Sequence, residues 1–303
     1  MDRRLKNKLA ECLNRPVLWN YPLAGHTTFG VGGPAAALAV VETHAELASF
    51  LGIVEQEGLA WRVLGGGSNV LVRDEGFDGV AVLLDGVFSH HSFGLTDGGV
   101  TVEAGAAVRF PKLLAMCVKQ GYAGLEFSAG IPGTVGGAVV MNAGAWGAAI
   151  ADVLTSVDIM GPLGQERIEA ANLQPQYRRM VIPVPQPYVV VSAILSLQHE
   201  NPADIHNRCD SYLQQRRLRQ PKAAGSAGSV FKNPEGDSAG RLIEASGLKG
   251  LKIGSAEVSN LHANVIINRG GASALDILRL MERIQQKVAA DSGIYLDPEV
   301  HIL

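Results

Sequence analysis

The alternation of apolar and polar residues in the first third of the chain predicts one helix and several short strands. Thr43-His44-Ala45-Glu46 has the spacing of a capping box, and apolar residues then recur at helical spacing until Gly58. This pattern predicts a helix over 43–58. Apolar runs bounded by turn residues predict strands at 61–64, 70–72 and 80–84. Together these elements describe a compact α/β unit.

The middle of the chain predicts a second unit that is richer in strands. We expect strands at 100–103, 153–160 and 188–197, and a helix over 110–120 that ends at Gly121. Residues 127–151 carry no charge, and this stretch exceeds the roughly 20 residues that a membrane span needs. Its frequent glycines and Asn142 make a helix in lipid unfavourable, so we predict no membrane span.

The last third of the chain changes character and predicts a small α+β sandwich. A polar, basic helix is expected from Pro202 to the Arg216-Arg217-Leu218-Arg219 run. A strand within 225–232, a helix over 239–246, a strand at 265–268 and a final strand at 299–303 follow. A long helix from Ser273 carries a predicted core stripe of Leu275, Leu278, Met281, Ile284 and Val288. The expected domains are therefore 1–90, 91–205 and 206–303.

Composition narrows the class of protein. The 303 residues are 47% hydrophobic and 18% charged, which indicates a soluble globular protein rather than a disordered one. A formal net charge of −3 provides no positive field for nucleic acid or an anionic membrane. The basic N-terminus is not followed by the apolar stretch of a secretion signal. We expect a cytoplasmic protein that acts on a small molecule, with neither nucleic acid nor membrane as a partner.

The cysteines indicate neither a disulfide framework nor a metal site. Cys12, Cys117 and Cys209 are odd in number, far apart and without a C-x-x-C spacing. A reducing compartment and the absence of a bound metal are the expectations that follow.

A run of glycines directly follows the predicted strand at 61–64. Adjacent glycines accept positive φ angles, so several backbone N–H groups can form one concavity that binds anions. Ser68 and Asn69 would add side-chain donors. A tight turn between strands explains an isolated glycine run equally well. The candidate cofactor-binding residues of this loop are Gly65, Gly66, Gly67, Ser68 and Asn69.

A second glycine loop over 128–137 has the same ingredients. Two such loops suit a diphosphate, which favours binding over plain turns. Its candidate cofactor-binding residues are Ser128, Gly130, Ile131, Pro132, Thr134, Gly136 and Gly137.

Other nucleotide-binding patterns are weak or missing. Residues 30–35 match the letters of a dinucleotide fingerprint, but no substantial strand precedes them and Pro34 lies in the loop. A P-loop signature does not occur in the sequence.

Separated blocks in a fixed order carry a more specific pattern. They are Thr27-Thr28-Phe29-Gly30-Val31-Gly32-Gly33-Pro34, Leu64-Gly65-Gly66-Gly67-Ser68-Asn69, the segment 124–145 with Met141-Asn142-Ala143-Gly144-Ala145, the segment 225–234 with Ser229-Val230-Phe231-Lys232-Asn233-Pro234, and Leu261-His262-Ala263-Asn264. Through them the chain resembles the UDP-N-acetylenolpyruvoylglucosamine reductase family, and its length matches the short (type II) subfamily. The resemblance implies an α+β protein: a two-lobed FAD-binding domain of the vanillyl-alcohol-oxidase/PCMH type, followed by a C-terminal α+β substrate-binding domain.

The resemblance also implies a reaction and its residues. FAD is the implied cofactor, NADPH the electron donor, and a UDP-sugar the substrate, whose enolpyruvyl ether is reduced to a lactyl ether for peptidoglycan synthesis. In the family pattern Arg178 binds the substrate carboxylate, Ser229 donates a proton, and Glu299 helps to stabilise the enolic intermediate. Taken alone, the three would be a surface cation, a loop hydroxyl and a solvated charge at a strand edge.

One departure concerns the surroundings of Arg178. The family continues Tyr-Arg-x-Ser-x-Phe, whereas residues 177–182 here lack both the serine and the phenylalanine. Local support for Arg178 is therefore open, and Arg179 offers a competing guanidinium. Candidates to bind the UDP diphosphate are Arg217, Arg219, Lys232 and Asn233, although the sequence does not tell which one contacts phosphate. His262 is interpreted as a structural histidine.

Two other functions compete with the reductase. An oxidase of alcohols or lactones would share the fold, but such proteins often attach flavin through a histidine near the first glycine loop, and none lies between Trp61 and Ser89. A nucleotide-sensing module would bind without turnover and leave the pattern of Arg178, Ser229 and Glu299 unexplained.

Overall fold

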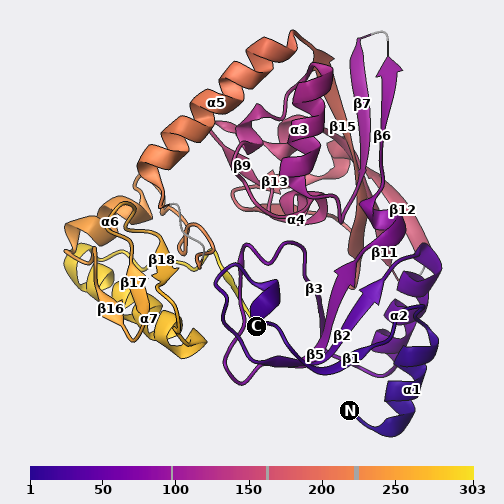
Figure 1. Cartoon of the computed structure of the whole chain (residues 1–303), viewed down its shortest axis with the longest axis horizontal. Helices are drawn as coiled ribbons and strands as arrows, with labels where there is room; N and C mark the ends of the chain where they lie inside the picture. Colours follow the sequence, from indigo (N-terminus) through magenta and orange to yellow (C-terminus); the bar gives the residue numbers. More distant parts are fainter. Residues whose placement is uncertain (97, 162–163, 222–224) are drawn as a thin grey trace. The chain divides into compact units, whose positions relative to one another are not determined.

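The computed structural model describes residues 1–96, 98–161, 164–221 and 225–303. The chain forms two compact units, each built from separate segments of the sequence (Figure 1). Unit 1 consists of 1–19, 37–66 and 79–214, and unit 2 of 20–36, 67–78 and 215–303. The division of the chain into the domains 1–90, 91–205 and 206–303 stays a prediction, which this division into two units does not test.

The N-terminal part of the chain combines helices with short and medium strands. Its elements are α1 (Arg3–Glu11), β1 (Leu18–Pro22), β2 (Pro34–Val41), α2 (His44–Gln56), β3 (Trp61–Val63), β4 (Val70–Leu71) and β5 (Phe77–Leu84). A four-stranded sheet has the order β1-β2-β5-β3. The predicted capping box opens α2: the Thr43 side chain accepts from the Glu46 N–H, and the Glu46 carboxylate accepts from the Thr43 N–H.

Unit 1 is dominated by a long antiparallel sheet. Its strands are β6 (His91–Thr96), β7 (Gly99–Gly105), β11 (Leu154–Gly161), β12 (Gly164–Glu169) and β15 (Val189–His199), in the order β12-β11-β15-β7-β6. The helices α3 (Phe110–Gln120) and α4 (Val135–Val140) contribute Leu113 and Val139 to one hydrophobic cluster with Val157 of β11 and Ala193 of β15. Helix α3 ends as predicted, because Gly121 has a left-handed φ of 75°.

The charge-free segment 127–151 forms short elements rather than a span. Its regular parts are α4, β9 (Gly144–Ala145) and β10 (Ala148–Ala149). Within the described residues, no helix is both long and apolar enough to cross a membrane. Downstream lie β13 (Gln174–Gln176) and β14 (Arg179–Val181), which form a hairpin. The strand β8 (Tyr122–Ala123) pairs with the end of β15.

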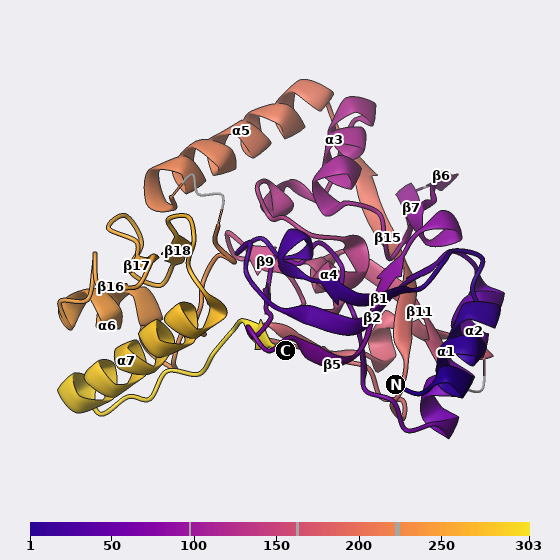
Figure 2. The same ribbon diagram turned by 60° about the horizontal axis from the view of Figure 1, so that its bottom comes forward.

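The C-terminal part begins with the predicted polar helix, α5 (Pro202–Arg219), and continues with the elements of unit 2 (Figure 2). These elements are α6 (Ala239–Ala245), β16 (Lys252–Ile253), β17 (Ala256–Val258), β18 (Ile266–Asn268), α7 (Ala274–Ser292) and β19 (His301–Ile302). The sheet order is β16-β17-β18, and β19 pairs in parallel with β4.

One local prediction for this region was wrong, and a second was only partly confirmed. Residues 225–232 form no strand, only isolated bridges from Ser229 to Val265 and from Phe231 to Pro298, because each pairing extends over a single residue. On α7, Met281, Ile284 and Val288 are buried as predicted, whereas Leu275 is 46% exposed and Ile277, which was not in the predicted stripe, is fully buried.

Candidate functional site

Within unit 1 the structure brings Gly65 and Gly66 of the first glycine loop against the second glycine loop. A Cβ on Gly65 would lie 2.6 Å from Thr134 Oγ1, and a Cβ on Gly66 would lie 2.6 Å from Gly133 Cα. Only glycine permits so close an approach of two chain segments. Arg109 also reaches this point, since its Nη1 would lie 3.2 Å from the same Gly66 Cβ. Arg109 lies outside the quoted motifs, and no sequence signal singled it out.

Several polar groups of the second loop shape the loop itself. The Ser128 hydroxyl donates to Leu125 O at 2.7 Å, and Thr134 Oγ1 accepts from the Gly137 N–H at 3.3 Å. The Gly136 N–H donates to Ala106 O at 2.9 Å. Gly130 has a φ of 80°, a backbone conformation that residues other than glycine rarely adopt. The two loops therefore approach each other through backbone and small atoms, at positions where a Cβ would collide with the facing loop. Diphosphate binding by these loops stays a prediction.

The end of the first loop, residues 67–69, belongs to unit 2 and contacts the C-terminal segment of that same unit. Asn69 Nδ2 donates to Glu299 O at 3.1 Å, and the His301 N–H donates to Asn69 O at 3.0 Å. Just beyond, Val70 pairs with His301 in the parallel β4–β19 pair. The loop predicted to bind cofactor is thus hydrogen-bonded to the segment that carries Glu299.

Ser229 and Glu299 lie on adjoining segments of the same unit. The Glu299 N–H donates to Val230 O at 2.7 Å, directly beside Ser229. The Lys232 N–H donates to Asp297 O at 2.8 Å, so the two segments stay together beyond this point. The structure therefore places the segment that carries Ser229 and Lys232 beside the segment that carries Glu299, although the two segments are widely separated in sequence.

Asn264 holds the Ser229 segment, a role the sequence analysis did not assign. Its side chain is buried and contacts both polar groups of one residue: Oδ1 accepts from the Phe231 N–H at 3.0 Å, and Nδ2 donates to Phe231 O at 2.7 Å. Its own carbonyl accepts from the Val230 N–H at 2.9 Å. Asn264 belongs to a quoted block, and that position was the one available signal.

His262 has the surroundings of a structural histidine. Its Nδ1 accepts from the Asn264 N–H at 3.2 Å, and its own N–H donates to Ser259 Oγ at 3.2 Å. Burial, together with the positive charge of Lys249, lowers the pKa of His262 below its ordinary value of 6.5. These contacts agree with the structural interpretation of this side chain.

Arg178 lies in the two-residue turn between β13 and β14. It has a left-handed φ of 59°, and its Nη1 donates to Gly144 O of β9 at 3.0 Å. Met180, at the position of the missing family serine, is buried in the hydrophobic core. The exposed Arg179 opens β14. The main-chain carbonyl of Gly144 therefore holds the Arg178 side chain in place. The serine and phenylalanine of the family pattern, which are missing here, cannot do so.

The predicted diphosphate residues fall on two elements. Lys232 is half-buried and follows the Ser229 segment, and Asn233 Oδ1 accepts from the Ala239 N–H at 3.1 Å at the start of α6. Arg217 and Arg219 are exposed in the last turn of α5.

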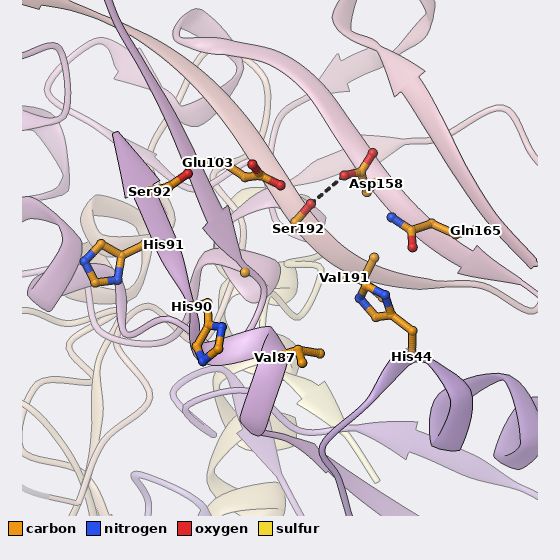
Figure 3. A pocket seen from close by; sticks show the side chains of 11 residues that line it. His44, Val87, His90, His91, Ser92, Glu103, Asp158, Gln165, Val191 and Ser192 are labelled. Atoms are coloured by element: carbon orange, nitrogen blue, oxygen red, sulfur yellow. Dashed lines mark hydrogen bonds between the residues drawn. The ribbon is translucent and has the colours of Figure 1, made fainter. Parts of the chain in front are cut away.

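A separate polar pocket of about 380 Å³ lies on unit 1 (Figure 3). Its buried carboxylate, Asp158, accepts from Arg167 Nε at 2.7 Å, from Arg167 Nη2 at 2.8 Å and from Ser192 Oγ at 2.8 Å. Hydrogen bonding to Arg167 is the main cause that lowers the pKa of Asp158 below its ordinary value of 3.8. No predicted site residue lines this pocket. Its lining residues are His44, Val87, His90, His91, Ser92, Glu103, Gly105, Asp158, Gln165, Val191 and Ser192.

Among the described residues, no group of three or more His, Cys, Asp or Glu side chains is arranged to hold a metal ion.

Comparison with known proteins gives consistent relatives. Residues 220–303 match the C-terminal domain of UDP-N-acetylenolpyruvoylglucosamine reductase, and residues 35–168 match an FAD binding domain. The UDP-N-acetylenolpyruvoylglucosamine reductase of Syntrophotalea carbinolica is 42% identical over 99% of this chain and 98% of that protein. The one from Bacillus subtilis is 37% identical over 95% and 94%.

A solved structure agrees with these sequences. The crystal structure of the reductase from Thermus caldophilus superimposes with a TM-score of 0.80 at 36% identity, covering 94% of this chain and 97% of that one.

Proposed function

The chain belongs to the UDP-N-acetylenolpyruvoylglucosamine reductase family, and on that premise we propose that it is an FAD-dependent, NADPH-driven reductase of peptidoglycan precursor synthesis. Its substrate would be UDP-N-acetylglucosamine enolpyruvate, and its product the lactyl ether UDP-N-acetylmuramate. Hydride and proton add across the enolpyruvyl double bond, and NADPH is oxidised to NADP⁺.

A series of hydrogen bonds in unit 2 is the main observation that supports this proposal. Asn69 of the first glycine loop donates to Glu299 O at 3.1 Å, and the Glu299 N–H donates to Val230 O at 2.7 Å. The end of the first glycine loop and the Ser229 segment are therefore both hydrogen-bonded to the main chain of Glu299. A protein that used the glycine run only as a turn would not need this continuity.

The residues present fit FAD. Backbone N–H groups near Gly65, Gly66, Gly133 and Thr134 would hold the diphosphate, with Arg109 supplying positive charge beside them. FAD, when bound, supplies the hydride that adds to the terminal vinyl carbon of the substrate. The chain must then orient the substrate and manage one proton and one developing negative charge.

Three side chains would do this work. The planar Arg178 guanidinium would bind the two oxygens of the substrate carboxylate. Ser229 would donate its proton to the carbon next to the vinyl terminus, and Glu299 would help to stabilise the enolic charge. Serine is a weak acid, so this transfer needs a strongly basic carbon and a nearby cation. Lys232, three residues along the same segment, can provide the positive charge.

The remaining assignments follow from charge. Lys232 and Asn233, and Arg217 and Arg219 at the end of α5, would contact the UDP diphosphate. We place the reaction in the cytoplasm, because Cys12, Cys117 and Cys209 are free thiols, as is usual in a reducing compartment.

The flavin spectrum tests the proposal directly. The purified protein should be yellow, its absorbance should bleach anaerobically with NADPH, and the enolpyruvyl sugar nucleotide should restore it. A colourless protein that takes up no FAD would contradict the assignment. Oxygen consumption with a simple alcohol, together with no response to the sugar nucleotide, would favour an oxidase instead.

The Ser229→Ala variant separates the two halves of the reaction. It should keep flavin reduction by NADPH and lose about 10²–10⁴-fold in reduction of the sugar nucleotide, the usual range for a proton-transfer group. Stopped-flow spectra measure both steps. Equal loss in both would remove the proton-donor role from Ser229.

A further inference from the structure

We propose that Asn142 is a positioning residue for Arg178, acting through the turn that carries the guanidinium. This inference rests on the proposed function, in which Arg178 binds the substrate carboxylate. Asn142 lies just after α4, and its side chain joins two separate segments of unit 1.

The turn that carries Arg178 does not adopt a preferred hairpin geometry. Gln176 pairs with Arg179, so Tyr177 and Arg178 form a two-residue loop. The favoured two-residue loops have positive φ at the first position or at both. Here Arg178, the second loop residue, has a φ of 59°, while Tyr177 is not among the positive-φ residues. A residue held in this region by its surroundings is common at functional sites.

A neighbouring hairpin shows the contrast. Ala145 pairs with Ala148, and the loop residues Trp146 and Gly147 have φ angles of 59° and 85°. Positive φ at both positions is the pattern that matches strand twist, so the β9–β10 hairpin needs less outside support. Trp146 also stacks on Tyr212 of α5, with centroids 5.2 Å apart and planes 4° from parallel. The β9–β10 hairpin can therefore keep its own conformation and hold the Arg178 turn in place through hydrogen bonds.

Two hydrogen bonds tie the strained turn to this neighbour. On one side Asn142 Nδ2 donates to Gln176 O at 3.0 Å, two residues before Arg178. On the other side Arg178 Nη1 donates to Gly144 O at 3.0 Å, two residues after Asn142. The backbone of the turn and the head of its side chain are thus both fixed to the segment 142–144.

The backbone and side chain of Asn142 are suited to this task. Its φ is 41°, a left-handed value that asparagine tolerates better than most residues. While Nδ2 contacts Gln176, Oδ1 accepts from the Ala151 N–H at 3.3 Å, which fixes the orientation of the amide plane. Donor and acceptor are therefore each committed, and only the donor serves the Arg178 turn.

The Asn142→Asp variant removes that donor selectively. Aspartate tolerates the same φ and keeps an acceptor for the Ala151 N–H, but it turns a carboxylate oxygen toward Gln176 O. We expect kcat/KM for the enolpyruvyl substrate to fall about 10- to 100-fold through KM, because a small misplacement of a positioning group has effects of this size. Titration calorimetry of the oxidised enzyme with substrate should show a matching loss of affinity, while flavin reduction by NADPH should stay within about twofold of the wild-type rate.

A double-mutant cycle with Arg178→Ala identifies the path of the effect. If Asn142 acts through Arg178, Asn142→Asp should change kcat/KM by less than about twofold in the Arg178→Ala background. Full additional loss in that background, or wild-type substrate affinity in Asn142→Asp, would overturn the positioning role. Should Arg178→Ala itself leave substrate reduction unchanged, the proposed role of Arg178 fails first, and the two failures stay distinct.

Two further variants complete the test. Asn142→Gly accepts the same φ without strain and lacks both side-chain contacts, so it should repeat the loss of substrate affinity. Asn172→Asp makes the same chemical change at an exposed position and should match the wild type. If neither Asn142→Asp nor Asn142→Gly shows a cooperative unfolding transition, Asn142 is needed for folding. Its proposed role in positioning Arg178 is then wrong.

Discussion

At the scale of single residues, asparagine side chains connect segments that the proposed reaction requires. Asn69 joins the first glycine loop to Glu299, and Asn264 holds the segment next to Ser229. A planar amide offers one donor group and one acceptor at a fixed angle, so it can replace a missing strand pairing. This explains why residues 225–232 keep a defined path although they form no strand.

The Asn264→Leu variant measures the strength of that contact. Leucine has a similar volume but leaves the Phe231 N–H and C=O without their buried partner. We expect the free energy of unfolding to fall by about 2–4 kcal/mol, since each unsatisfied buried group costs about 1–3 kcal/mol. Urea unfolding followed by circular dichroism gives the value.

A surface change provides the control for this prediction. Asn207→Leu replaces an exposed asparagine of α5 and should alter stability by less than about 0.5 kcal/mol. An Asn264→Leu protein as stable as this control would mean that the two side-chain contacts contribute nothing.

At the scale of elements, the β11–β12 pair is joined by an ion pair as well as by its backbone ladder. Asp158 and Arg167 are directly opposite in the register, and the guanidinium forms two hydrogen bonds with the buried carboxylate. Ser192 Oγ donates to the same carboxylate, and the nearby His44 also favours its ionised form. Strand pairing and charge therefore stabilise the same position of the sheet.

The pH dependence of this pair can be measured with Arg167→Met. The folded-state pKa of Asp158 lies below the ordinary 3.8, so its contribution to stability is present above that pH and is lost as pH falls through the folded value. At neutral pH the variant should unfold about 1–3 kcal/mol more easily, because a charged hydrogen bond to a buried carboxylate is removed.

Urea midpoints at a series of pH values provide the check. The difference between wild type and Arg167→Met should narrow once the pH falls below about 4, where the unfolded carboxyl becomes protonated. A difference that stays constant down to acid pH would show that Asp158 does not titrate as its contacts require.

At the scale of the whole molecule, cofactor binding should appear in overall stability. Because FAD would bind only the folded chain, removing it should lower the unfolding temperature, and an FAD concentration 100 times its dissociation constant adds about 2.7 kcal/mol. Gly66→Ala should retain less flavin after purification, since its Cβ would lie 2.6 Å from Gly133 Cα. The ratio of flavin to protein absorbance measures retention.

Gly52→Ala is the matched control within α2. A Cβ there meets nothing within 4 Å, and alanine favours the helix, so flavin retention should be unchanged. Normal flavin content in Gly66→Ala would contradict the role of the paired glycine loops.

Much of this protein could be inferred from local sequence. Helices α2 and α3 were predicted with their start or end signals, because a capping box and a terminal glycine act through neighbouring backbone groups alone. The glycine loops and Ser229 lie within blocks of local sequence, and the roles of Arg178, Ser229 and Glu299 were predicted from the family resemblance that these blocks carry. Each of these sequence signals is contained in a short stretch of consecutive residues.

The contacts between distant segments came only from the tertiary structure. The buried face of α7 depends on which elements pack against it, so helical spacing placed Leu275 in the core although it is exposed. The approach of Gly66 to Gly133, and the bonds from Asn69 to Glu299 and from Asn142 to Gln176, join residues that no local pattern relates. Sequence by itself determined the chemical groups and the local conformations available. Folding decided which groups meet, because hydrogen bonding and packing depend on distance in space and not along the chain.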